Sequence, residues 1–99
     1  MQHVGGFCIA ADHPSLPGHF PGHPVVPGVV LLDAVFGLIS AQWPGRAVIG
    51  VPSVKFTAPV RPGQQVDVSC DAGSDRVAFA CVVGGRDVLR GSVTLGIRT

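Results

Sequence analysis

Residues 13–36 read HPSLPGHFPGHPVVPGVVLLDAVF, and this stretch organises the rest of the chain. Its first half is so rich in proline and glycine that we predict a loop rather than a helix or a strand. Its second half opens a helix, predicted over residues 29–41, in which apolar side chains follow one another almost without interruption. Because they lie on every face, we expect this helix to be covered by protein on all sides. It is too short for a membrane span, which takes about 20 residues.

Asp33 is the one charged residue of this predicted helix. An isolated carboxylate in apolar surroundings is costly, so we expect the group to be protonated, hydrogen-bonded or turned toward a polar cavity. A structural aspartate, bonded to nearby backbone or hydroxyl groups, is the alternative. Perturbed acids cluster at active sites, which makes Asp33 a candidate catalytic acid.

The start of the helix offers a second feature. Pro27 suits a first helical turn, but no Ser, Thr, Asp or Asn precedes it as a cap. The N–H groups of Gly28 and Val29 are therefore left without an obvious partner, and they could hold a carbonyl oxygen on which negative charge develops. The alternative is that water or a local turn satisfies these amides.

His19 lies in the loop between glycine and proline residues that restrict the backbone around it. A neutral imidazole is an effective general base near pH 7, although a loop histidine can also be a solvated bystander. A metal site formed by His13, His19 and His23 with Asp33 is a further alternative, because imidazole and carboxylate suit zinc or iron. The prolines prevent a helix that would place His19 and His23 on one face, so we predict no metal.

Residues 18–35, GHFPGHPVVPGVVLLDAV, resemble the signature GHFPxxPxxPGVLxxE/D of the hotdog-fold 3-hydroxyacyl-acyl carrier protein dehydratases. Residues 51–66, VPSVKFTAPVRPGQQV, are similar to the KFxxPVxPGD block of that family, so the resemblance covers most of the chain. Gln64 stands where the family often has an acid. With Asp33 at the position of the acid, the chain resembles the dehydratase/isomerase branch of the family, because the dehydratase-only branch usually has Glu there. The short chain and its motif DHPSLPGHFPGHPVVPGVVLLD, residues 12–33, also resemble small dehydratase-like proteins of aryl polyene and related polyketide-type clusters.

The resemblance implies a reaction and its residues. It implies removal of water from a 3-hydroxyacyl thioester on acyl carrier protein to give the trans-2-enoyl thioester, in fatty acid or polyene/polyketide-type biosynthesis. His19 would be the base, Asp33 the acid, and the Gly28 N–H a donor to the thioester carbonyl. No cofactor is implied. The acyl chain would lie in an apolar tunnel whose expected lining is Phe20, Val29, Val30, Ala34, Phe36 and Gly37; for each of these, ordinary core packing is the alternative.

The resemblance also implies partners. Two sheets would join edge to edge in a homodimer or in a heterodimer with a related hotdog subunit, with a higher oligomer as the alternative. Each site would take its histidine from one chain and its acid from the other. Acyl carrier protein is acidic, so Lys55, Arg61 and Arg86 are unranked candidates for docking it. Two rival functions remain: an acyl thioesterase, which the HFPG loop argues against, and a non-catalytic partner subunit, which an intact His19 and Asp33 argue against.

Composition agrees with a small cytoplasmic oligomer. Ninety-nine residues make one domain spanning 1–99, and 46% hydrophobic with 13% charged residues is apolar for a small monomer. A net charge of +1 without a Lys/Arg run argues against nucleic acid as a partner. Cys8, Cys70 and Cys81 form no CxxC pair and no signal peptide precedes them, so we expect reduced core thiols. A Cys70–Cys81 disulfide across a hairpin stays open.

The remaining segments are predicted strands, at residues 6–11, 47–58, 65–71, 77–83 and 87–97, with residues 1–5 frayed. Pro52 indicates a bulge or an edge position, and segment 77–83 is apolar on both faces, which favours a central strand. One helix followed by consecutive antiparallel strands predicts an α+β domain in which a curved sheet wraps one central helix. This is the hotdog fold that the resemblance implies.

Overall fold

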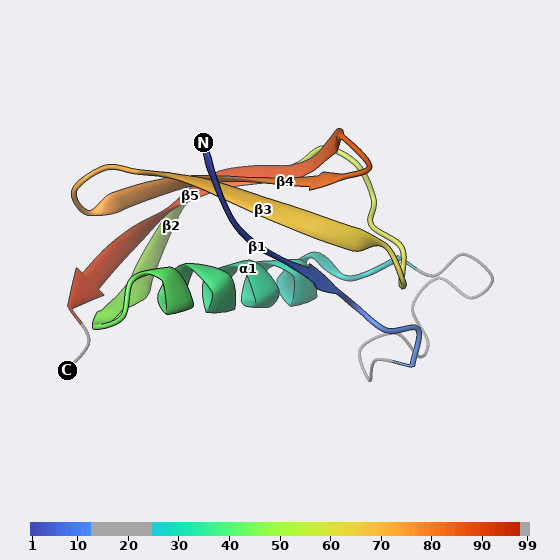
Figure 1. Cartoon of the computed structure of the whole chain (residues 1–99), viewed down its shortest axis with the longest axis horizontal. Helices are drawn as coiled ribbons and strands as arrows, with labels where there is room; N and C mark the ends of the chain where they lie inside the picture. The colour runs from blue at the N-terminus through green and yellow to red at the C-terminus, as the bar shows by residue number, and fades with distance from the viewer. Residues whose placement is uncertain (13–24, 98–99) are drawn as a thin grey trace.

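The computed structural model describes residues 1–12 and 25–97. A single helix of the described chain lies under one face of a curved sheet (Figure 1). In chain order the elements are β1 (Gln2–Cys8), α1 (Gly28–Gln42), β2 (Arg46–Phe56), β3 (Gln65–Ala72), β4 (Arg76–Val83) and β5 (Arg86–Ile97). Within these described ranges, no helix combines the length and apolar character that crossing a membrane requires.

The sheet has five strands in the order β1-β3-β4-β5-β2, and every neighbouring pair is antiparallel. β4 lies at the centre, as its two apolar faces predict. β2 lies at an edge, and its register with β5 shifts between Val48 and Gly50 and again between Gly50 and Ser53. Pro52 falls inside the second shift, because a residue without an N–H is tolerated at a bulge of an edge strand.

The first strand differs from its prediction. β1 begins at Gln2 and ends at Cys8, pairing with β3 from Gln2↔Cys70 to Cys8↔Gln65, whereas the sequence predicted a frayed start and a strand over 6–11. Two consecutive glycines weaken the local preference for a strand. The ladder with β3 overrides that preference, which only the tertiary structure reveals.

The core lies between α1 and the inner face of the sheet. Its fully or nearly fully buried apolar residues are Val26, Leu31, Val35, Ile39, Val60, Val66, Val68, Cys70, Val77, Phe79, Cys81, Val88, Leu89, Val93 and Leu95. Cys70 and Cys81 are free thiols in this core, so the disulfide left open by the sequence does not form. Cys8 is exposed, which corrects the expectation of three core thiols, because it belongs to the last residue pair of edge strand β1.

Only one side of α1 is covered. Leu31, Val35 and Ile39 face the sheet and are buried, whereas Val29 is 74% exposed and Asp33 and Gly37 are exposed as well. A single sheet covers one stripe of a helix, so the expectation of a helix covered on all sides is wrong for the single chain. Val29 is the large apolar side chain of α1 that is available to another molecule.

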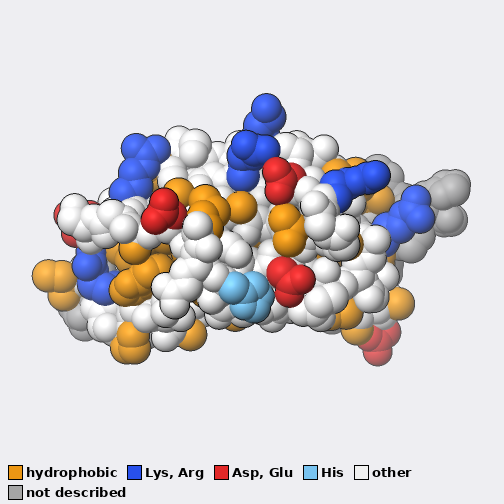
Figure 2. Space-filling view, turned by 45° about the horizontal axis from the view of Figure 1, so that its top comes forward, with side chains coloured by type: hydrophobic (Ala, Val, Ile, Leu, Met, Phe, Trp, Pro, Cys, Tyr) orange, Lys and Arg blue, Asp and Glu red, His pale blue; other side chains and the backbone are white. Residues whose placement is uncertain are grey.

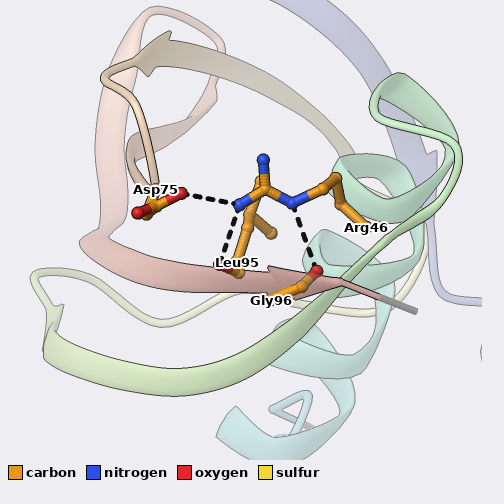
Figure 3. Close-up of polar contacts among 4 residues, drawn as sticks. All are labelled: Arg46, Asp75, Leu95 and Gly96. Atoms are coloured by element: carbon orange, nitrogen blue, oxygen red, sulfur yellow. Dashed lines mark hydrogen bonds and ion pairs between the residues drawn. The ribbon is translucent and has the colours of Figure 1, made fainter. Parts of the chain in front are cut away.

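Arg46 fixes the edge strand at the end of the molecule where α1 finishes (Figure 3). Its Nη2 donates to Asp75 Oδ1 and to the Leu95 carbonyl, both at 2.9 Å, and its Nε donates to the Gly96 carbonyl at 3.2 Å. The Leu95 N–H donates in turn to the Asp75 carbonyl at 2.7 Å. One guanidinium therefore joins the start of β2, the β3–β4 turn and the end of β5.

Candidate active site

The N-terminus of α1 has no side-chain cap. Pro27 occupies the N-cap position, and its carbonyl accepts hydrogen bonds from the N–H groups of Val30 at 3.0 Å and Leu31 at 3.3 Å. The N–H groups of Gly28 and Val29 find no acceptor among the described residues. The uncapped helix start predicted from the sequence is therefore observed among the described residues. The two amides lie at the positive end of the helix dipole, and their role toward an anionic oxygen stays a prediction.

Phe56, the last residue of β2, packs directly on this helix start. A Cβ atom on Gly28 would lie 2.7 Å from Phe56 Cζ and 3.1 Å from its Cε1, so only glycine fits without moving the ring. Phe56 is itself 48% exposed. The sequence offered no sign of this contact beyond the presence of both residues in the two family-like blocks. The structure brings those blocks together at one place.

The segment between β2 and β3 supports the same corner. The Val26 N–H donates to the Val60 carbonyl at 2.8 Å, which holds the chain just before α1 against this segment. The Thr57 N–H donates to the Val88 carbonyl at 2.9 Å, and the Gly63 N–H donates to the Ile9 carbonyl at 2.9 Å. Backbone hydrogen bonds from three parts of the chain therefore fix the position of the free helix amides.

Asp33 lies on the exposed side of α1 and not in the core. It follows Val29 by one helical turn and precedes Gly37 by another, so the three residues share a face. Its side chain makes no hydrogen bond or ion pair with another described residue. Asp33 is thus exposed in the single chain, where the sequence predicted apolar surroundings, and the structural-aspartate alternative finds no partner in the described part of the chain. The group is available to a ligand or to a second molecule.

The expected tunnel residues fall into two groups. Val30 and Phe36 are half-buried and pack against the core, so the core-packing alternative holds for them in part. Val29 and Gly37 are exposed, Ala34 is half-buried between them, and a Cβ atom on Gly37 would meet no atom within 4 Å. The second group forms an open face beside Asp33, with room for a chain or for a neighbouring helix.

The loop residues of the predicted site, His13, His19, Phe20 and His23, lie outside the described residues. The pairing of His19 with Asp33 therefore stays a prediction. Among residues 1–12 and 25–97, no three His, Cys, Asp or Glu side chains come together as a metal site. The described part of the site consists of the Gly28 and Val29 amides, Phe56 and the Asp33 carboxyl group.

Solved structures with the same architecture define the class. An uncharacterised protein from Erwinia carotovora subsp. atroseptica is 27% identical with a TM-score of 0.76, over 93% of this chain and 80% of that one. The dehydratase heterocomplex ApeI:P from Xenorhabdus doucetiae is 24% identical with a TM-score of 0.75, over 94% and 84%. A variant of the fluoroacetyl-CoA-specific thioesterase FlK is 18% identical with a TM-score of 0.64, over 95% and 86%. The latter two likenesses concern the fold alone, and this protein has the hotdog fold.

The family follows from the sequence itself. Residues 2–92 match the model of the ApeI-like family, which is described as ApeI dehydratase. The chain belongs to the ApeI-like dehydratase family. The resemblance found in the sequence is thus confirmed at the level of a hotdog-type dehydratase family.

Proposed function

We propose that this protein dehydrates a 3-hydroxyacyl thioester carried by acyl carrier protein to the trans-2-enoyl thioester, in fatty acid or polyene/polyketide-type biosynthesis. The observation that carries the proposal is the start of α1, where two unclaimed amides and the accessible Asp33 carboxyl group share one helix in a chain of a dehydratase family. This arrangement supplies a site for a developing oxyanion and an acid on the same rigid element.

The first chemical task is to make the carbon next to the thioester acidic enough to lose a proton. Negative charge moves onto the thioester oxygen as that proton leaves, and the free Gly28 N–H at the helix start would stabilise it. The ring of Phe56 lies against the Cα of Gly28 at this position. Neutral His19 would accept the proton.

The second task is to expel the hydroxyl group. Asp33, in its protonated form, would donate a proton to the hydroxyl on carbon 3, so that water leaves as the bond between carbons 2 and 3 becomes double. The proton held by His19 then returns to the Asp33 carboxylate, through solvent or the departing water, and both groups regain their starting forms. No redox change occurs, so the proposed reaction needs no cofactor.

A second hotdog subunit would complete the site. Two elements present apolar side chains to solvent. On α1 this is Val29, which lies on the same face as Asp33, and on the edge strand β2 these are Ile49, 67% exposed, and Val51, 42% exposed. Pairing of two β2 edges would extend the sheet and bring the two helices together, which removes an unpaired edge. We propose a dimer in which His19 of one chain meets Asp33 of the other.

The deciding experiment follows 3-hydroxyacyl- and 2-enoyl-carrier-protein thioesters with the purified protein. Interconversion by the wild type, abolished in His19→Ala and in Asp33→Asn, is the expected result. Release of free thiol instead would replace the proposal with the thioesterase alternative, whose fold neighbour is the thioesterase FlK.

A non-catalytic partner role is the second candidate, because one fold neighbour is a heterocomplex of dehydratase subunits. Its test is the same assay with a related hotdog subunit added. Turnover that appears only in the mixture and survives both His19→Ala and Asp33→Asn in this chain would establish the partner role and exclude catalysis by this chain.

A further inference from the structure

A hollow of about 510 Å³ lies between the segment that follows β2 and the β4–β5 hairpin. Its described lining residues are Ala58, Pro59, Arg61, Gln64, Val83, Gly84, Arg86 and Val88. Two of these are arginines and none is acidic. Neither Arg61 nor Arg86 uses its guanidinium in an ion pair or hydrogen bond with another described residue. The hollow therefore combines two available guanidinium groups with apolar and amide surface.

This hollow lies at the same end of the molecule as the candidate active site. The β4–β5 turn, the segment after β2 and the start of α1 occupy one end of the fold (Figure 1). The Val26–Val60 hydrogen bond of 2.8 Å joins the residues just before α1 to the neighbour of Arg61. The hollow of Arg61 and Arg86 therefore lies at the same corner of the fold as the start of α1.

Lys55, the third candidate cation, lies elsewhere. It lines a separate shallow hollow on the sheet face away from α1, together with Arg76, Asp87 and Arg90. There Arg90 forms an ion pair with Asp87 at 3.1 Å, and Arg76 donates to Ser92 Oγ from both Nε and Nη2. Figure 2 shows that basic and acidic side chains are interspersed on this part of the surface. An anion gains less from cations that are already engaged with acids or hydroxyl groups.

We propose that Arg61 and Arg86 bind the phosphate group of the phosphopantetheine arm that carries the acyl thioester on acyl carrier protein, an inference that rests on the proposed function. Guanidinium groups match phosphate geometry with two parallel N–H···O bonds, and such charge-assisted bonds are stronger than neutral ones. The Gln64 side chain accepts from the Arg61 N–H at 2.9 Å and so orders the turn that presents this arginine. The apolar lining, including Val83, suits the aliphatic part of the arm.

The test compares binding of phosphopantetheine with binding of pantetheine, which lacks only the phosphate, by calorimetry without any turnover. The wild type should bind the phosphorylated compound at least about tenfold more tightly. The Arg61→Ala/Arg86→Ala protein should lose that preference. The matched control, Lys55→Ala/Arg90→Ala, removes the same charge from the other hollow and should keep it. Unchanged thermal unfolding of both proteins shows that the exposed substitutions leave the fold intact.

Three outcomes would overturn the inference: no preference in the wild type, a preference that survives loss of both arginines, or an equal loss in the control, which would indicate a general effect of net charge. Binding of carrier protein that lacks the phosphopantetheine group is measured as well. If that carrier protein binds as tightly as the armed form and needs the same arginines, these residues recognise the acidic protein surface and not the phosphate. Because binding is measured without catalysis, a phosphate preference in a protein that fails the dehydration assay would leave this inference standing while the proposed function falls.

Discussion

The two sides of helix α1 differ sharply in how far they are covered. The side that faces the sheet carries Leu31, Val35 and Ile39, which are all at most 3% exposed because the sheet of the same chain covers them. The opposite side carries Val29, Asp33 and Gly37, and in a single chain it meets solvent. The contrast teaches that one side of the helix stabilises the domain, while the other is left accessible for the chemistry and the assembly that we propose.

The largest expected effect tests whether the exposed side carries the chemistry. Asp33→Asn removes the acid but keeps its size, so kcat for dehydration should fall by about 10²–10⁴-fold, or about 3–5 kcal/mol in activation free energy. Because Asp33 is exposed and unpartnered within the described chain, urea unfolding should change by less than about 0.5 kcal/mol. Full activity in this variant would assign the acid elsewhere.

The second prediction tests the covered side. Ile39→Ala deletes a fully buried side chain, so the free energy of unfolding should fall by about 2–5 kcal/mol because a cavity is left against the sheet. Val29→Ala, on the exposed side of the same helix, is the matched control and should cost less than about 0.5 kcal/mol at concentrations where the protein is monomeric. Similar losses in both variants would show that the two sides are equally covered in solution.

The third prediction concerns the helix start, where the two sides meet. Gly28→Ala forces a methyl group toward the Phe56 ring and should cost about 1–3 kcal/mol in unfolding free energy. In the Phe56→Ala background the same substitution should cost clearly less, because the obstructing ring is gone. Equal costs in the two backgrounds would mean that the glycine is needed for its backbone and not for the ring contact.

The smallest expected effect concerns the buried thiols of the core and tests how far burial excludes water from them. Burial raises the pKa of Cys70 to about 11 and that of Cys81 to about 12, the latter with a contribution from the neighbouring Cys70. Both thiols therefore stabilise the fold fully below the unfolded pKa near 9, and this contribution is lost as pH rises through the folded values. The loss should be under about 1 kcal/mol at pH 9 and should grow between pH 9 and 11.

Urea titrations across this pH range measure the effect, and the chain has no tyrosine to add its own alkaline titration. The Cys70→Ala/Cys81→Ala protein is the control and should lose most of the alkaline slope. An unchanged slope in that protein would place its origin outside the core.

Much of the fold could be predicted from the sequence, because local patterns determine it. The helix, the bulged edge position of Pro52 and the central position of β4 follow from turn residues and apolar periodicity, and all three are confirmed. β1 was misplaced because its partner strand lies some sixty positions away, and pairing at such a distance leaves no local signal. The uncapped helix start was predictable from the absence of a capping side chain.

The candidate site was harder to predict for two physical reasons. An apolar helix pattern predicts that the helix is covered, but the pattern is the same whether its own sheet or another molecule covers it. The exposure of Asp33 in the single chain could therefore not be predicted. The contact between Gly28 and Phe56 joins residues far apart in sequence, and the local sequence at neither position predicts it. Arg61 and Arg86 were identified as cations, but only the fold separates their hollow from that of Lys55.

The strand order also has a consequence for how the protein is made. β2 pairs only with β5 within the described sheet, and Arg46 closes on carbonyl groups some fifty residues later. While the ribosome is still synthesising the intervening hairpin, β2 is an apolar strand with no hydrogen-bonding partner on either side. The nascent chain thus exposes this edge until β5 emerges, which is the interval in which a chaperone or an already folded subunit could cover it.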